Sequence, residues 1–186
     1  MKHSPINFAA DKYGGAILAY DSILTVNGGN FADNYAKFGS AIYGEDSTIN
    51  IANGVFINKK HVMWSLVYCI GSTIDIQDCV FANTTSKYAT AVYGNNNTSI
   101  RKSKFINLLA NMTAGAIAVK GASPKFNVKI EGCEFINTTS IKNGGAIYLD
   151  MNADNNSSKA KVLINNSSFR DCYSEFGGAL LILGGD

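Results

Sequence analysis

A phenylalanine recurs along this chain at intervals of 23 to 34 residues. Each is followed by Asn or Asp two or three places later and by a Gly-Gly-Ala-Ile-like run about ten places later. The seven members of this row are Phe8, Phe31, Phe56, Phe81, Phe105, Phe135 and Phe169. Self-similarity at such a period is typical of solenoids, whose units stack on their neighbours. The period predicts one domain of about seven stacked coils over residues 1–186.

The composition of each repeat indicates the kind of solenoid. Short alternating runs of β-branched and aromatic residues, such as Ile49, Ile51 and Phe56, are separated by clusters of Asn, Gly, Ser and Thr. No repeat has a 3.6-residue apolar period of helical length. We therefore predict an all-β chain that forms a right-handed, single-stranded parallel β-helix.

Three further rows follow from aligning the repeats. An alanine row, in which one coil has Leu, comprises Ala16, Ala41, Leu66, Ala91, Ala116, Ala146 and Ala179. The residue after each of these is always apolar and is expected to face inward: Ile17, Ile42, Val67, Val92, Ile117, Ile147 and Leu180. Two residues past Phe, and in phase with it, stand Asp33, Asn58, Asn83, Asn107, Asn137 and Asp171. We expect this last row to be an inward structural ladder that satisfies backbone groups at a corner.

The four cysteines do not predict a disulfide framework. Cys79 and Cys133 occupy the same position, two residues before Phe, in coils separated by one intervening coil. Coils stack about 4.8 Å apart, so these two lie about 9 to 10 Å apart, beyond the roughly 7 Å limit for a bridge. We expect buried free thiols there, while Cys69 and Cys172 remain unassigned.

Charge and hydropathy exclude several partners. Charged residues make up 16% of the chain and the formal net charge is +2, so there is no electrostatic footprint for nucleic acid. The longest late apolar run, Ala179 to Leu183, is too short to span a bilayer, and no apolar signal segment follows Met1. The terminal coils lack polar caps, so we expect a fragment of a longer repeat protein, with no direct membrane insertion in this segment.

The paired motifs resemble the repeats of chlamydial polymorphic outer membrane proteins and of the β-helix adhesin-like surface proteins of methanogenic archaea. The resemblance covers nearly the whole chain. It rests on Gly14-Gly15-Ala16-Ile17, Gly144-Gly145-Ala146-Ile147, Gly177-Gly178-Ala179-Leu180 and Phe31-Ala32-Asp33-Asn34. It implies an extracellular, cell-surface location and adhesion to glycans or proteins of a host or neighbouring cell, with no cofactor.

A tyrosine row is the candidate ligand-binding site. Tyr43, Tyr68, Tyr93 and Tyr148 each follow a residue of the inward apolar row, and should therefore face outward. An exposed aromatic platform can pack on the faces of sugars while its hydroxyls bond to ring substituents. The alternative is a cross-strand aromatic stack that only stabilises the sheet.

Two longer coils place their extra residues near 120–127 and 150–159, in successive coils. Neighbouring long loops on a rigid scaffold are a second candidate binding region, and solvated excursions are the alternative. Asp150 and Asp154 lie there but lack an EF-hand pattern, so no metal site is assigned.

Several Asn-x-Ser/Thr triplets are possible glycan acceptors. We expect only those in the long loops, especially Asn155 and Asn156, to be accessible, because Asn83 and Asn137 belong to the inward ladder.

Charged residues also align between coils. Gln77, Arg101 and Glu131 share one outward position, Asp78 and Lys102 share the next, and Asp75, Ser99 and Lys129 share a third. One interpretation is a polysaccharide lyase or glycoside hydrolase that uses Arg101. The other is a ladder of cross-coil ion pairs, which we prefer, so no catalytic residue is assigned. A structural spacer is a further alternative to adhesion.

Overall fold

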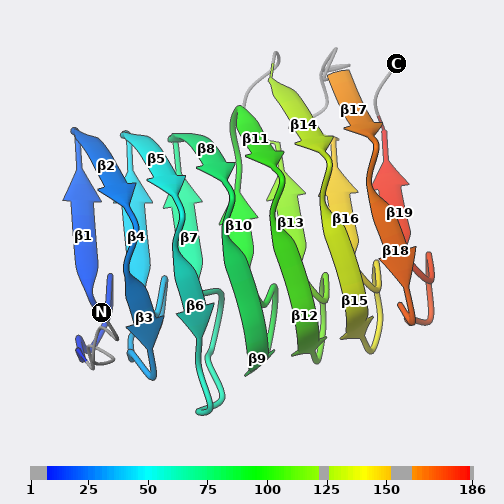
Figure 1. The fold of residues 1–186 in the computed structure, drawn as a ribbon, viewed down its shortest axis with the longest axis horizontal. Helices are drawn as coiled ribbons and strands as arrows, with labels where there is room; N and C mark the ends of the chain where they lie inside the picture. Colours follow the sequence, from blue (N-terminus) through cyan, green and yellow to red (C-terminus); the bar gives the residue numbers. More distant parts are fainter. Residues whose placement is uncertain (1–7, 122–125, 152–160, 185–186) are drawn as a thin grey trace.

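The computed structural model describes residues 8–121, 126–151 and 161–184. They form a parallel β-helix in which six coils each contribute one strand to each of three parallel sheets, and a seventh coil adds one strand to the first sheet (Figure 1). This confirms the predicted fold class. The described residues form no helix that is long and apolar enough to cross a membrane.

Strands three apart in the chain are neighbours in each sheet. The first sheet contains β1 (Ile17–Tyr20), β4 (Ile42–Glu45), β7 (Val67–Ile70), β10 (Val92–Gly94), β13 (Ile117–Lys120), β16 (Ile147–Asp150) and β19 (Leu180–Leu183). The second contains β2 (Ile23–Asn27), β5 (Thr48–Ala52), β8 (Thr73–Gln77), β11 (Thr98–Arg101), β14 (Asn127–Glu131) and β17 (Lys161–Asn165). The third contains β3 (Asn30–Ala32), β6 (Val55–Ile57), β9 (Val80–Ser86), β12 (Lys104–Ala110), β15 (Glu134–Ser140) and β18 (Ser168–Arg170).

The phenylalanine row forms a continuous stack inside the third sheet. Six rings, from Phe31 to Phe169, lie with neighbouring centroids 4.7–5.2 Å apart and planes within 10° of parallel. The four central rings are completely buried. The inward apolar row is in register across the whole first sheet, as predicted. Like residues on successive coils therefore build the core.

The assignment of Phe8 to that row was wrong. Ala9 pairs with Tyr35, so Phe8 lies beside Asn34 rather than Phe31, and it is 52% exposed. Ile17 is the ninth residue after Phe8, whereas the apolar row is the eleventh or twelfth residue after each of the other phenylalanines. The first coil is therefore too short at this point to place a ring in the stack.

The asparagine ladder exists, but the predicted inward direction was wrong. Asn83, Asn107 and Asn137 adopt left-handed backbone with φ of 51–54° and are exposed. Their side-chain amides donate to one another along the corner, at 3.0 and 2.9 Å. A left-handed residue breaks the alternation of a strand, so the third residue after Phe points inward instead of the second. Asn58 is the exception: its coil is one residue shorter here, and its buried amide donates to the carbonyl of Asn34.

The cysteines are free thiols, as expected. Cys79 and Cys133 are buried in the position two before Phe, with Ser103 in the same position of the coil between them. Burial raises the pKa of all three core thiols, and that of Cys69 to about 12. Only Cys172 is partly exposed.

Thiol labelling should therefore distinguish one cysteine from three. We expect a thiol-reactive dye to modify Cys172 rapidly in the native protein at mildly alkaline pH, because the other three are buried and remain protonated. Cys172→Ser should remove the fast phase. A fast phase that persists in this variant would show that a core thiol is accessible.

Candidate ligand-binding pocket

The structure brings three of the four predicted tyrosines together. Tyr43, Tyr68 and Tyr93 occupy the second position of β4, β7 and β10, directly after the inward apolar row. Their rings stack with centroids 5.8 and 4.5 Å apart and planes within 9° of parallel. We call these three the inner aromatic row. Tyr148 occupies the same position on β16 but is separated from them by Ala118 on β13.

A second column of rings, which the sequence analysis missed, lies against the inner row. It comes from the turns that precede the strands of the first sheet, and successive centroids are 5.5, 5.7 and 4.0 Å apart. This outer aromatic row comprises Tyr13, Phe38, Trp64 and Tyr88. It contacts the inner row at four points, with centroid distances of 4.5, 5.2, 5.4 and 5.7 Å.

The outer aromatic row covers two tyrosines of the inner row. Tyr43 is 3% exposed and Tyr68 is 5% exposed, so the expectation of an exposed platform was wrong for both. Burial is also the main reason that the pKa of each phenol is raised. Tyr43 and Tyr68 form an aromatic stack that stabilises the sheet. Tyr93 and Tyr148 remain partly exposed.

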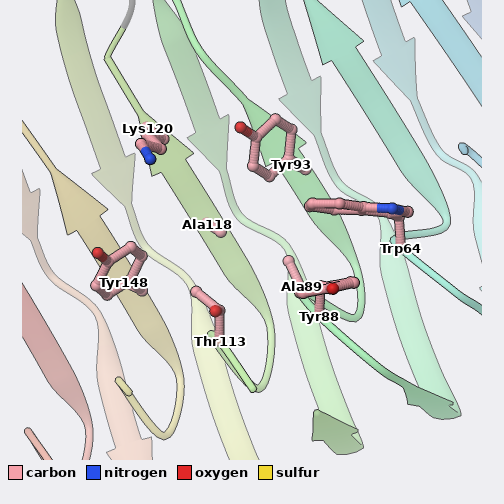
Figure 2. A pocket seen from close by; sticks show the side chains of 8 residues that line it. All are labelled: Trp64, Tyr88, Ala89, Tyr93, Thr113, Ala118, Lys120 and Tyr148. Atoms are coloured by element: carbon pink, nitrogen blue, oxygen red, sulfur yellow. The ribbon is translucent and has the colours of Figure 1, made fainter. Parts of the chain in front are cut away.

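Both aromatic rows lack a ring in the same coil. Ala118 takes the inner position next to Tyr93, and Thr113 follows Tyr88 by 25 residues, the offset that relates Ala91 to Ala116. The two missing rings leave a pocket of about 270 Å³ (Figure 2). Its lining comprises Trp64, Tyr88, Ala89, Tyr93, Thr113, Ala118, Lys120 and Tyr148.

Tyr93 and Tyr148 stand on opposite sides of Ala118, one coil away in each direction (Figure 2). Two strand spacings separate their positions, about 9.5 Å. That is room for one further ring at the stacking distance found in the inner row. In the inner row the pocket is therefore a one-ring vacancy with aromatic walls and an alanine floor, and it opens outward where Thr113 replaces a ring of the outer row.

Polar groups stand at the rim of this vacancy. Lys120 lies two residues beyond Ala118 on β13, so both point to the same side of the sheet. The Tyr148 hydroxyl donates to Asp150 Oδ2 at 3.4 Å. Burial, with a further contribution from the Asp150 charge, raises the pKa of Tyr93 and of Tyr148. Both phenols are therefore protonated near neutral pH. Tyr93 can donate a hydrogen bond to a ligand, whereas Tyr148 donates its proton to Asp150 and can accept one.

The charged residues of the second sheet align as predicted, and they form ion pairs. Arg101 Nη2 contacts both carboxylate oxygens of Asp75, at 3.0 and 2.9 Å. Lys129 Nζ lies 2.8 Å from Glu131, and this hydrogen bond is the main reason that the pKa of Glu131 is lowered. These side chains are partly exposed, where such pairs contribute little to stability.

Several predicted features lie outside the described residues. Most of the two long inserts, including Asp154, Asn155 and Asn156, falls within 122–125 and 152–160. Across the three described ranges, no group of three or more His, Cys, Asp and Glu side chains is placed to hold a metal ion.

One sequence signal did point to the pocket. Ala118 follows Ile117 as Tyr93 follows Val92, so the alignment alone shows a small residue in a tyrosine position. A second signal was missed: an aromatic residue stands three places before the alanine row at Tyr13, Phe38, Tyr88 and Phe176, and Thr113 replaces it before Ala116. Trp64 had no such signal, because it lies two places before Leu66.

Searches of protein-family models, curated proteins and solved structures find no match to this chain. The ligand class is therefore inferred from the pocket and from the repeats.

Proposed function

We propose that this chain is a non-enzymatic, adhesin-like β-helix segment of a cell-surface protein, and that it binds glycans at the Ala118 pocket. The one-ring vacancy between Tyr93 and Tyr148 carries this proposal. A pyranose ring presents apolar C–H faces, which pack on aromatic side chains, and hydroxyls at its edge, which need hydrogen-bond partners. The walls of the pocket meet the first need and its rim meets the second.

The size and chemistry of the pocket fit a single neutral sugar ring. A volume of about 270 Å³ is just below the range of drug-sized sites, roughly 300–1,000 Å³. Lys120, Thr113 and the phenol hydroxyls supply donors and acceptors around the opening. Phenols whose pKa is raised are poorly matched to proton transfer near neutral pH, which favours binding over catalysis. The resemblance of the repeats to surface adhesins supports display outside the cell.

Filling the vacancy should abolish glycan binding. Ala118→Tyr continues the inner aromatic row from Tyr93 to Tyr148, so we expect the fold to be retained and binding to fall to background. The wild-type chain would first be screened on a glycan array, and its best ligand then titrated by calorimetry into both proteins. Ala52→Tyr is the matched control, because Ala52 lies on the second sheet, away from the pocket, and should leave the affinity unchanged.

Removing one wall should weaken binding without filling the pocket. Tyr148→Ala is expected to lower the affinity by about tenfold, because a stacking contact contributes on the order of 1 kcal/mol. Equal affinity in wild-type, Ala118→Tyr and Tyr148→Ala proteins would place the glycan site elsewhere. A wild-type chain that binds no glycan would overturn the proposal and leave the spacer role.

A further inference from the structure

A line of lysines follows one long edge of the solenoid. These residues lie in the turns that lead from the third sheet to the first, along the lower edge in Figure 1. All of them are exposed. We call this set the lysine ridge; it comprises Lys12, Lys37, Lys59, Lys60, Lys87 and Lys142.

The register places these lysines on successive coils. Tyr13 pairs with Phe38, so Lys12 and Lys37, directly before them, are neighbours. Thr113 pairs with Asn143 of the following coil, so Lys142 lies beside Met112 of the preceding coil. Every coil from the first to the sixth, apart from the fifth, therefore presents at least one ammonium group at this edge. With a rise of about 4.8 Å per coil, the ridge extends over roughly 24 Å.

The charge of the ridge is poorly compensated locally. The turns that contain it hold four carboxylates, Asp11, Asp33, Asp171 and Glu175, against six lysines, and Asp171 pairs with Arg170 outside the ridge. No ridge lysine forms an ion pair with another described residue. The four ion pairs of the described chain involve other cations: Arg101–Asp75, Lys104–Glu134, Lys129–Glu131 and Arg170–Asp171. Since the whole chain carries only +2, positive charge is concentrated at this edge.

Three of the ridge lysines lie over the aromatic ring that follows them in the chain. The ammonium groups of Lys12, Lys37 and Lys87 are 5.0, 5.4 and 5.5 Å from the centroids of Tyr13, Phe38 and Tyr88. The same rings stack on one another in the outer aromatic row. Their faces are therefore occupied and are not a platform for stacking nucleobases. The ridge contains no arginine, so it presents compact point charges without the planar guanidinium that stacks on bases.

We propose that the lysine ridge binds an acidic polysaccharide that lies along the solenoid axis, with its anionic groups paired to successive lysines. A row of cations on five of six successive coils is complementary to a linear polymer that carries repeated negative charge. The ridge borders the Ala118 pocket at Tyr88, over which Lys87 lies, but no ridge lysine lines the pocket, and this inference does not depend on the proposed sugar site.

Polygalacturonate is a suitable probe. A ridge variant, Lys12→Gln with Lys37→Gln, Lys87→Gln and Lys142→Gln, would be compared with a control that removes four other lysines as Gln: Lys102, Lys104, Lys129 and Lys161. Both lose the same charge, and circular dichroism would check that both are folded. At low salt we expect the wild type and the control to bind polygalacturonate, and the ridge variant to bind at least about tenfold more weakly.

Other outcomes would overturn the inference. Equal losses in the ridge variant and the control would show that net charge alone drives binding. No binding by the wild type, or tighter binding to duplex DNA than to polygalacturonate at the same salt, would exclude a polysaccharide surface. Ala118→Tyr should bind polygalacturonate like the wild type, which separates this test from that of the pocket.

Discussion

Phe105→Ala should lower the free energy of unfolding by about 3–5 kcal/mol. Phe105 is completely buried between Phe81 and Phe135, with ring centroids 5.2 and 4.8 Å away. Its backbone is fixed on both sides by parallel pairing, so the coil has little freedom to collapse into the cavity. A loss of this size is a large part of the stability of a typical domain, roughly 5–15 kcal/mol.

Leu109→Ala is the matched control for this change. Leu109 lies on the same strand, β12, but is 39% exposed. We expect it to cost less than about 1 kcal/mol, because truncation of a partly exposed side chain leaves no closed cavity. Urea unfolding monitored by circular dichroism would measure both. Similar losses for the two variants would contradict the view that the phenylalanine stack is the main source of core stability.

Gly145→Ala should destabilise the chain by about 3 kcal/mol, at the upper end of the usual cost of overpacking. A Cβ built on Gly145 would overlap the carbonyl oxygen of Gly178 in the next coil and lie 2.7 Å from the backbone N and O of Tyr173. These are backbone atoms, which cannot rotate away as a side chain can. The coils must therefore separate locally to admit one methyl group.

Gly178→Ala supplies the control, since Gly178 occupies the same position one coil later. A Cβ there meets only the carbonyl oxygen of Cys172, at 4.0 Å. We expect a change within about 0.5 kcal/mol. Thermal unfolding of both variants would test the difference. If both glycines tolerate alanine equally well, close approach of neighbouring coils does not restrict this position.

The repeat predicted the rows whose members are chemically alike. From Phe31 onward, the phenylalanine row and the inward apolar row recur with like side chains although the coils differ in length, so aligning them was sufficient to predict their register. In a parallel β-helix, the register between successive coils determines how the strands pair and therefore determines the fold. The absence of a disulfide between Cys79 and Cys133 followed from the same alignment.

The errors arose at corners, where the number of residues between two inward-facing positions differs from that in an extended strand. In the coil of Asn83, the left-handed residue makes the third residue after Phe face inward. In the coil of Asn58, which is one residue shorter here, the second residue after Phe faces inward. Strand alternation holds only within extended backbone, so it could not predict the direction of a corner residue. Phe8 was misplaced for a similar reason, because the first coil is two residues shorter before Ile17.

The pocket could not be predicted from any single row, because it is formed by contacts between two rows. The sequence predicted Tyr93 and Tyr148 as binding residues, yet their ability to contact a ligand depends on whether the outer aromatic row covers them. Three members of that row lie three residues before the alanine row, but Trp64 lies two residues before Leu66 and breaks the pattern. Only the folded coil shows that Trp64 stacks on Tyr88, and that Thr113 leaves the next position open.

The parallel pairing has a mechanical consequence for a chain anchored at one end and loaded at the other. The hydrogen bonds that join neighbouring coils run along the long axis, so an axial pull loads them in series and the outermost coil detaches first. Phe81 and Phe105 occupy equivalent positions 24 residues apart. Each released coil would therefore add roughly 80 Å of extended tether, and the segment would lengthen stepwise under tension instead of breaking its attachment at once.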